Sequence, residues 1–62
     1  MLWLSELLMQ DHEVSSFEEL KERIRERALQ GELHFGMDVR PPFADTPDDW
    51  EEVLESTFYS AR

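Results

Sequence analysis

A chain of 62 residues that contains no cysteine has to form its core without disulfide bonds or thiolate-bound metal ions. A domain of this size buries only about 60% of the surface that its unfolded chain exposes, so its stability has to come from close packing or from a partner. Apolar residues make up 40% of the chain and recur at regular spacings, which favours a folded core over disorder. We therefore expect one small domain that spans residues 1–62.

The chain is strongly acidic, with 15 acidic and 6 basic side chains and a formal net charge of -9. Such a charge influences partner choice more than fold, and it repels nucleic acid. The apolar start at residues 1–4 is followed by Glu6 and Asp11, well short of the roughly 20 residues that span a membrane. We expect neither a signal peptide nor a membrane anchor, and the lack of cysteine favours the cytoplasm.

Residues 2–10 have apolar side chains on two sides. One side of a helix over this segment would hold Trp3, Leu4, Leu7 and Leu8. Leu2 and Met9 would lie on the other side, so a strand is the alternative to a helix here. A connection over residues 11–15 follows.

Ser16 and Glu19 form a capping-box pattern, which predicts the start of a helix over residues 17–30. Ser15 and Glu18 offer a competing register for the same start. The apolar stripe of this helix consists of Phe17, Leu20, Ile24 and Ala28. Its spacing predicts a helix with one buried face.

Gly31, which tolerates the left-handed conformation that ends many helices, precedes a segment with a period of two. The apolar positions of this segment are Leu33, Phe35, Met37 and Val39. The alternation predicts a strand over residues 32–39 with one buried face, ended by Pro41. A lone strand needs either a second strand from residues 1–14 or a copy of itself across a homodimer. We favour the first alternative, and hence a monomer.

Thr46 and Pro47 predict the start of the last helix, as its N-cap and its first helical residue. The apolar side of this helix contains Trp50, Val53, Leu54, Thr57, Phe58 and Ala61. The predicted fold is therefore mainly α with a short β element, in the order α/α/β/α.

The start and the opposite side of this last helix form the candidate binding surface. Its members are Asp45, Asp48, Asp49, Glu51, Glu52, Glu55 and Tyr59. Acids are expected in the first turn of any helix, so a solvated helix end is the alternative. Glu52 and Glu55 lie beyond that turn, where the helix dipole no longer stabilises them. Their position favours a surface that meets a positive partner.

Other kinds of chemistry have less support in the sequence. Acidic residues interleave the cations Lys21, Arg23, Arg25 and Arg27. This pattern is typical of an ion-paired solvent face rather than of a phosphate-binding patch. His12 and His34 lack the spacing of metal ligands, so we expect no metal site. Without a phosphate loop, a nucleophile elbow or a Ser/His/Asp order, we expect no catalytic residues and no cofactor.

The chain resembles small acidic inhibitors of phages and mobile elements. The resemblance consists of the acidic residues within 45–55, the small size, the lack of cysteine and the charge of -9. Anti-CRISPR proteins and DNA mimics are the notable examples. The resemblance implies a protein partner with a basic surface, of the kind found in nucleic-acid-binding complexes, and no direct contact with nucleic acid or membrane. Carboxylates on successive helix turns, about 5.4 Å apart, can occupy the field that a cationic channel offers to phosphates.

Two hypotheses for the function follow from these patterns. The first is an acidic, non-catalytic inhibitor that binds the cationic nucleic-acid-binding surface of a protein complex. The second is a structural or regulatory protein–protein interaction module, such as an antitoxin-like partner or a dimer subunit. The second would make its contact through the apolar strand and the N-terminal segment.

Overall fold

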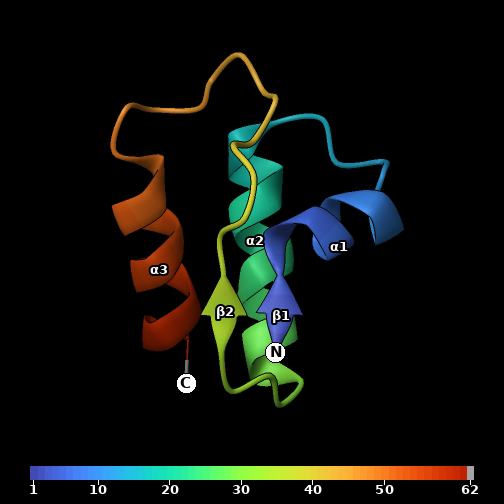
Figure 1. The fold of residues 1–62 in the computed structure, drawn as a ribbon, viewed down its shortest axis with the longest axis vertical. Helices are drawn as coiled ribbons and strands as arrows, with labels where there is room; N and C mark the ends of the chain where they lie inside the picture. Colours follow the sequence, from blue (N-terminus) through green and yellow to red (C-terminus); the bar gives the residue numbers. More distant parts are fainter. Residues whose placement is uncertain (62) are drawn as a thin grey trace.

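The computed structural model describes residues 1–61 of the chain. Its elements are β1 (Leu2–Trp3), α1 (Leu4–Gln10), α2 (Phe17–Leu29), β2 (Phe35–Gly36) and α3 (Trp50–Ser60). Figure 1 shows α2 behind the two strands, α3 on the side of β2, and α1 on the side of β1. The fold is mainly α with a short β element, as predicted, and the additional first strand makes the order β/α/α/β/α.

Residues 2–10 contain both of the structures that the sequence left open. Leu2 and Trp3 form β1, and α1 begins directly after them. Trp3 has an extended backbone, with φ -95° and ψ 135°, and ends the strand. Leu2, Leu4 and Leu7 are all buried. The change from strand to helix explains why Leu2 joins the same core as the helical leucines, although a helix over the whole segment would have turned it away.

The two strands pair in parallel, with Leu2 opposite Phe35 and Trp3 opposite Gly36. The backbone amide of Leu2 also donates a 2.8 Å hydrogen bond to the carbonyl oxygen of His34. The partner of the second strand therefore comes from residues 1–14, which was the favoured alternative. Figure 1 shows both arrows pointing in the same direction in front of α2.

The strand predicted over residues 32–39 is much shorter than expected. β2 contains only Phe35 and Gly36, and of the four alternating apolar residues only Phe35 is buried. Leu33 is 63% exposed and Val39 is 39% exposed. The reason is that α1 begins after two residues of β1, so the parallel ladder has no further partner on that side.

The second helix begins as predicted. The Ser16 hydroxyl accepts a 3.1 Å hydrogen bond from the backbone amide of Glu19, which selects this register over the one that begins at Ser15. The Glu19 carboxylate accepts hydrogen bonds from the hydroxyls of Ser15 and Ser16, at 2.9 and 3.3 Å. All four residues of the predicted stripe are buried. Gly31 has a φ of 114°, so the left-handed conformation predicted after this helix is confirmed.

The start predicted for the last helix is wrong by several residues. α3 begins at Trp50, after a turn at Asp48 and Asp49. Glu52 therefore lies in the first turn of α3, so its predicted place beyond that turn is wrong, whereas Glu55 does lie beyond it. The hydroxyl of Thr46 donates a 3.5 Å hydrogen bond to the carbonyl oxygen of Pro41 instead of capping a helix. This bond closes the loop of residues 41–46 before α3, and Pro41 in that loop is fully buried.

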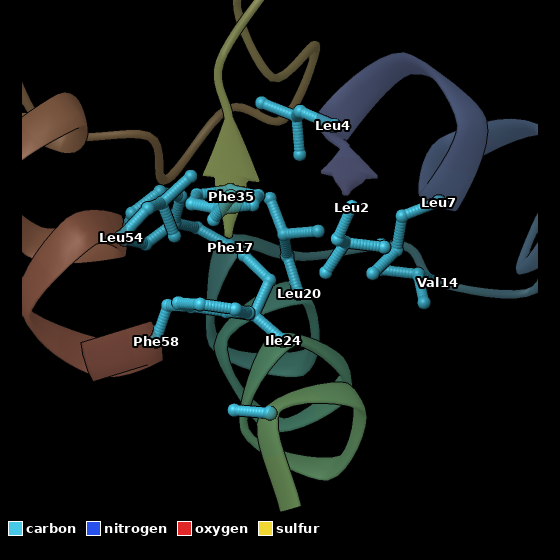
Figure 2. Packing of buried hydrophobic residues seen from close by; sticks show 11 residues of the cluster. Leu2, Leu4, Leu7, Val14, Phe17, Leu20, Ile24, Phe35, Leu54 and Phe58 are labelled. Carbon is cyan, nitrogen blue, oxygen red and sulfur yellow. The ribbon is translucent and has the colours of Figure 1, made fainter. Parts of the chain in front are cut away.

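The core lies between α2, the strands and α3, and every element contributes to it (Figure 2). Its buried apolar residues are Leu2, Leu4, Leu7, Val14, Phe17, Leu20, Ile24, Ala28, Phe35, Leu54 and Phe58. The rings of Phe35 and Phe58 stack with centroids 5.3 Å apart, which joins β2 to α3. This packing fixes which side of α3 faces the solvent.

Candidate protein-binding surface

The orientation of α3 follows from its two fully buried residues, Leu54 and Phe58. Because an α-helix repeats every 3.6 residues, burial of these positions turns Glu51, Glu52 and Glu55 to the solvent, where all are exposed. Five acidic residues of α3 and the turn before it are exposed together: Asp48, Asp49, Glu51, Glu52 and Glu55. We call these five residues the α3 acidic surface.

Tyr59 follows Glu55 by one helical turn and is 50% exposed. Its ring meets Phe58 edge-on, with centroids 5.0 Å apart and an interplanar angle of 85°. The Tyr59 ring thus packs against Phe58, while half of the Tyr59 side chain stays accessible to solvent. Tyr59 is thus an exposed aromatic residue beside the α3 acidic surface, as the sequence indicated.

The cations of α2 form their ion pairs away from this surface. The pairs made by α2 cations are Lys21–Glu18 (3.1 Å), Arg23–Glu13 (3.3 Å), Arg23–Glu26 (3.4 Å) and Arg27–Asp11 (3.4 Å). Within residues 1–61, no ion pair involves a carboxylate of the α3 acidic surface. Helices α2 and α3 pack through their apolar faces, so their contact leaves this negative charge uncompensated.

Asp45 has a different environment from the other predicted contact residues. Its carboxylate accepts a 2.8 Å hydrogen bond from the backbone amide of Phe17, the first residue of α2. The sequence grouped Asp45 with the acids that follow it, but the structure gives its side chain an internal partner. No local pattern indicates this contact, because the two residues are 28 positions apart.

A second long-range contact was not found from the sequence. The backbone amide and the hydroxyl of Ser5 donate hydrogen bonds of 3.0 and 2.5 Å to the two carboxylate oxygens of Asp38. Both bonds lower the pKa of Asp38 below its ordinary value of 3.8, and the bond from the hydroxyl has the larger effect. Trp3, the N-cap residue of α1, has no side-chain acceptor, so Asp38 acts as the acceptor for the first turn.

Other features of the described structure give less indication of a functional site. An open hollow over α2 is lined by Glu19, Glu22, Arg23 and Glu26. Among the described residues, no three His, Cys, Asp or Glu side chains are grouped so that they could hold a metal ion. Of the helices in the described part of the chain, none is long and apolar enough to cross a membrane.

Comparisons of the chain with protein-family models, curated proteins and solved structures found no significant match. A fold by itself does not determine a function, so the function has to be inferred from the chemistry of the surface. The most distinctive chemistry is the uncompensated charge of the α3 acidic surface.

Proposed function

We propose that the protein is an acidic, non-catalytic inhibitor that binds the cationic nucleic-acid-binding surface of a protein complex. The observation that supports this proposal is that five exposed carboxylates along α3 and its preceding turn have no ion pair within residues 1–61. Of the described cations, Lys21, Arg23 and Arg27 pair with acids elsewhere, and Arg25 and Arg40 form no ion pair with these carboxylates. A surface lined with Lys and Arg supplies the missing counter-charge and attracts the protein over a distance.

The inhibitor acts by occupying the surface that phosphates would use. Glu51 and Glu52 lie on the first turn of α3 and Glu55 lies on the next, at a pitch of about 5.4 Å, so the helix sets the spacing of these three side chains. No catalytic step is needed, because bound inhibitor and nucleic acid compete for the same cations. Tyr59 supplies an aromatic contact beside these side chains, and such contacts mainly slow dissociation.

The experiment compares two double variants with the same change in charge. Glu52→Gln/Glu55→Gln removes two charges from the α3 acidic surface. Glu6→Gln/Glu22→Gln removes two charges from α1 and α2, where both residues are also exposed and have no ion pair in the described region. Glutamine keeps helix propensity, so all four helical positions should retain their structure.

Binding is measured against the protein that copurifies with the full chain at low salt, identified by mass spectrometry. We expect the α3 variant to associate more slowly and to show a weaker salt dependence, while the control stays close to wild type. Tyr59→Ala should accelerate dissociation instead. Equal effects of the two double variants would contradict a localised binding surface.

The apolar interaction module is the second candidate, and the exposure of two large side chains favours it. Trp3 is 39% exposed and Leu33 is 63% exposed, although Phe35, which was expected to share their role, is buried. Binding through these residues should persist at high ionic strength and weaken in Leu33→Ala. Binding through the α3 acidic surface should be lost at high salt and be insensitive to Leu33→Ala.

A further inference from the structure

The outer face of the two-stranded sheet carries a large aromatic side chain. Side chains of a strand alternate between its two faces, so burial of Leu2 and Phe35 turns Trp3 and Gly36 away from the core. Figure 1 shows no helix in front of the strands on this side. Trp3 is 39% exposed there. A tryptophan on an open sheet face is a strong candidate for a contact residue.

Gly36 fixes the position of the indole. A Cβ atom at Gly36 would overlap the six-membered ring of Trp3 and would lie 2.9 Å from Cε of Met1. The ring of Trp3 therefore lies directly against the backbone of β2, in space that only a glycine leaves open. An aromatic ring that is held in this way loses little conformational freedom when a partner binds.

Two carboxylates contact residues that lie close to Trp3 in the sequence. The amino group of Met1 pairs with Glu32 at 3.5 Å, and Ser5 donates hydrogen bonds to Asp38. Met1 and Ser5 are two residues before and after Trp3, so both carboxylates are bonded to residues close to Trp3 along the chain. Asp38 is exposed and Glu32 is partly exposed. Glu32 is paired with the amino group of Met1, so of these two carboxylates Asp38 is the one that has no cationic partner in the described residues.

Among the described residues, no cation stacks on this ring. Within residues 1–61, the cation–ring contact is that of the Lys21 ammonium over Phe17, at 5.9 Å from the centroid. The accessible part of the Trp3 ring is therefore available to a cation from another molecule.

We propose that Trp3, resting on Gly36, binds an arginine side chain of the protein partner, with Asp38 and Glu32, which are bonded to residues near Trp3, as the neighbouring acids. We call these four residues the Trp3 platform. The plane of a guanidinium can stack on the indole, and its N–H groups can donate hydrogen bonds to a nearby carboxylate such as Asp38. Charge favours a cationic occupant, because a net charge of -9 repels both nucleic acid and a second copy of the chain, and stacking of the planar guanidinium favours arginine over lysine. The inference rests on the proposed function in one respect, that the partner is cationic.

The experiment uses hexa-arginine and hexa-lysine peptides as probes for the full chain. The variant Trp50→Phe serves as the background, so that Trp3 gives the single indole signal in fluorescence and in NMR spectra. We expect the indole N–H resonance of Trp3 to shift on titration with hexa-arginine. Trp3→Leu should weaken binding of hexa-arginine roughly 2- to 5-fold and reduce its preference over hexa-lysine.

Two further variants keep the result interpretable. Met9→Ala removes a side chain that is 76% exposed on α1, outside the platform, and should bind both peptides as the background does. Gly36→Ala should displace the indole and weaken binding of hexa-arginine while Trp3 is still present. Circular dichroism establishes which variants fold, and the indole resonance of the background protein decides the question if Trp3→Leu does not fold.

Different experimental results would contradict the Trp3 platform and the proposed function. An indole resonance that does not move at saturating hexa-arginine would overturn the platform, whatever happens at α3. A shifted indole resonance, together with the loss of arginine preference in Trp3→Leu, would support it. If Glu52→Gln/Glu55→Gln binds the identified partner as tightly as the Glu6→Gln/Glu22→Gln control, the α3 surface is wrong, and the peptide result still decides the platform.

Discussion

The carboxylate of Asp45 accepts a 2.8 Å hydrogen bond from the backbone amide of Phe17, 28 residues earlier in the chain. Phe17 is the first residue of α2, so its amide has no partner within the helix. A negative charge at this position also interacts favourably with the helix dipole. An acid in the loop before α3 thereby stabilises the start of α2.

We predict that Asp45→Ala lowers the free energy of unfolding by about 0.5–2 kcal/mol, the usual cost of losing a capping side chain. Asp48→Ala is the matched control, because Asp48 is exposed and its side chain has no hydrogen bond in the described structure. Urea denaturation of both variants measures the difference. Equal stability of the two would show that the Asp45 contact contributes little in solution.

The Ser5–Asp38 contact predicts a loss of stability in acid. Hydrogen bonds from Ser5 lower the pKa of Asp38 in the folded protein below its ordinary value of 3.8. The stabilisation is therefore fully present above the unfolded-state pKa and is lost as the pH falls through the lower folded-state value.

Urea midpoints measured at pH values from about 6 down to 2.5 test this expectation. Asp38→Asn should be less stable than wild type at the upper end of the range, and the difference should shrink as the pH falls. A difference that is independent of pH would contradict the assignment to the Asp38 carboxylate.

The core predicts large effects from two truncations. Ile24 and Leu54 are fully buried on the facing sides of α2 and α3. Replacing either by alanine should cost about 2–5 kcal/mol, against a total of roughly 3–9 kcal/mol for a domain of this size. Leu29→Ala, at a position that is 64% exposed, should change the midpoint of thermal unfolding by a few degrees at most. A cooperative transition of Leu54→Ala near that of wild type would exclude it from the core.

The parallel pairing of β1 with β2 predicts a monomer. Because β2 finds its partner within the same chain, the fold has no need for a second copy to complete the sheet. Sedimentation velocity at micromolar concentration should show a single species of 7.4 kDa. A dimer would indicate that copies associate through another surface, and the variant Trp3→Leu would test whether the outer sheet face is that surface.

Local patterns predicted the helices far better than they predicted the contacts between distant segments. The stripe of α2 and its Ser16 cap depend on residues within a few turns, and the structure confirms them. Burial of Leu54 and Phe58 was likewise predicted from helical spacing, and it determines which side of α3 is exposed. Most of the candidate surface could therefore be located from the sequence.

The errors arose where a local signal competes with a tertiary contact. Thr46 followed by Pro47 is a good start signal for a helix, yet the Thr46 hydroxyl bonds to Pro41 and α3 begins later. Alternation over 32–39 predicted a long strand, but the length of its partner limited the ladder to two residues. The roles of Asp38 and Asp45 depend on contacts 33 and 28 residues apart, which single-sequence patterns do not report.

The contacts of α1 imply that the chain unfolds as one cooperative unit. A helix of 7 residues is too short to be stable alone in water. Its first turn depends on Asp38, and the strand before it depends on Phe35 and Gly36, both from the other half of the chain. A peptide that ends before β2 should therefore be unstructured. In hydrogen-exchange measurements, the amides of α1 and α2 should exchange through the same opening event.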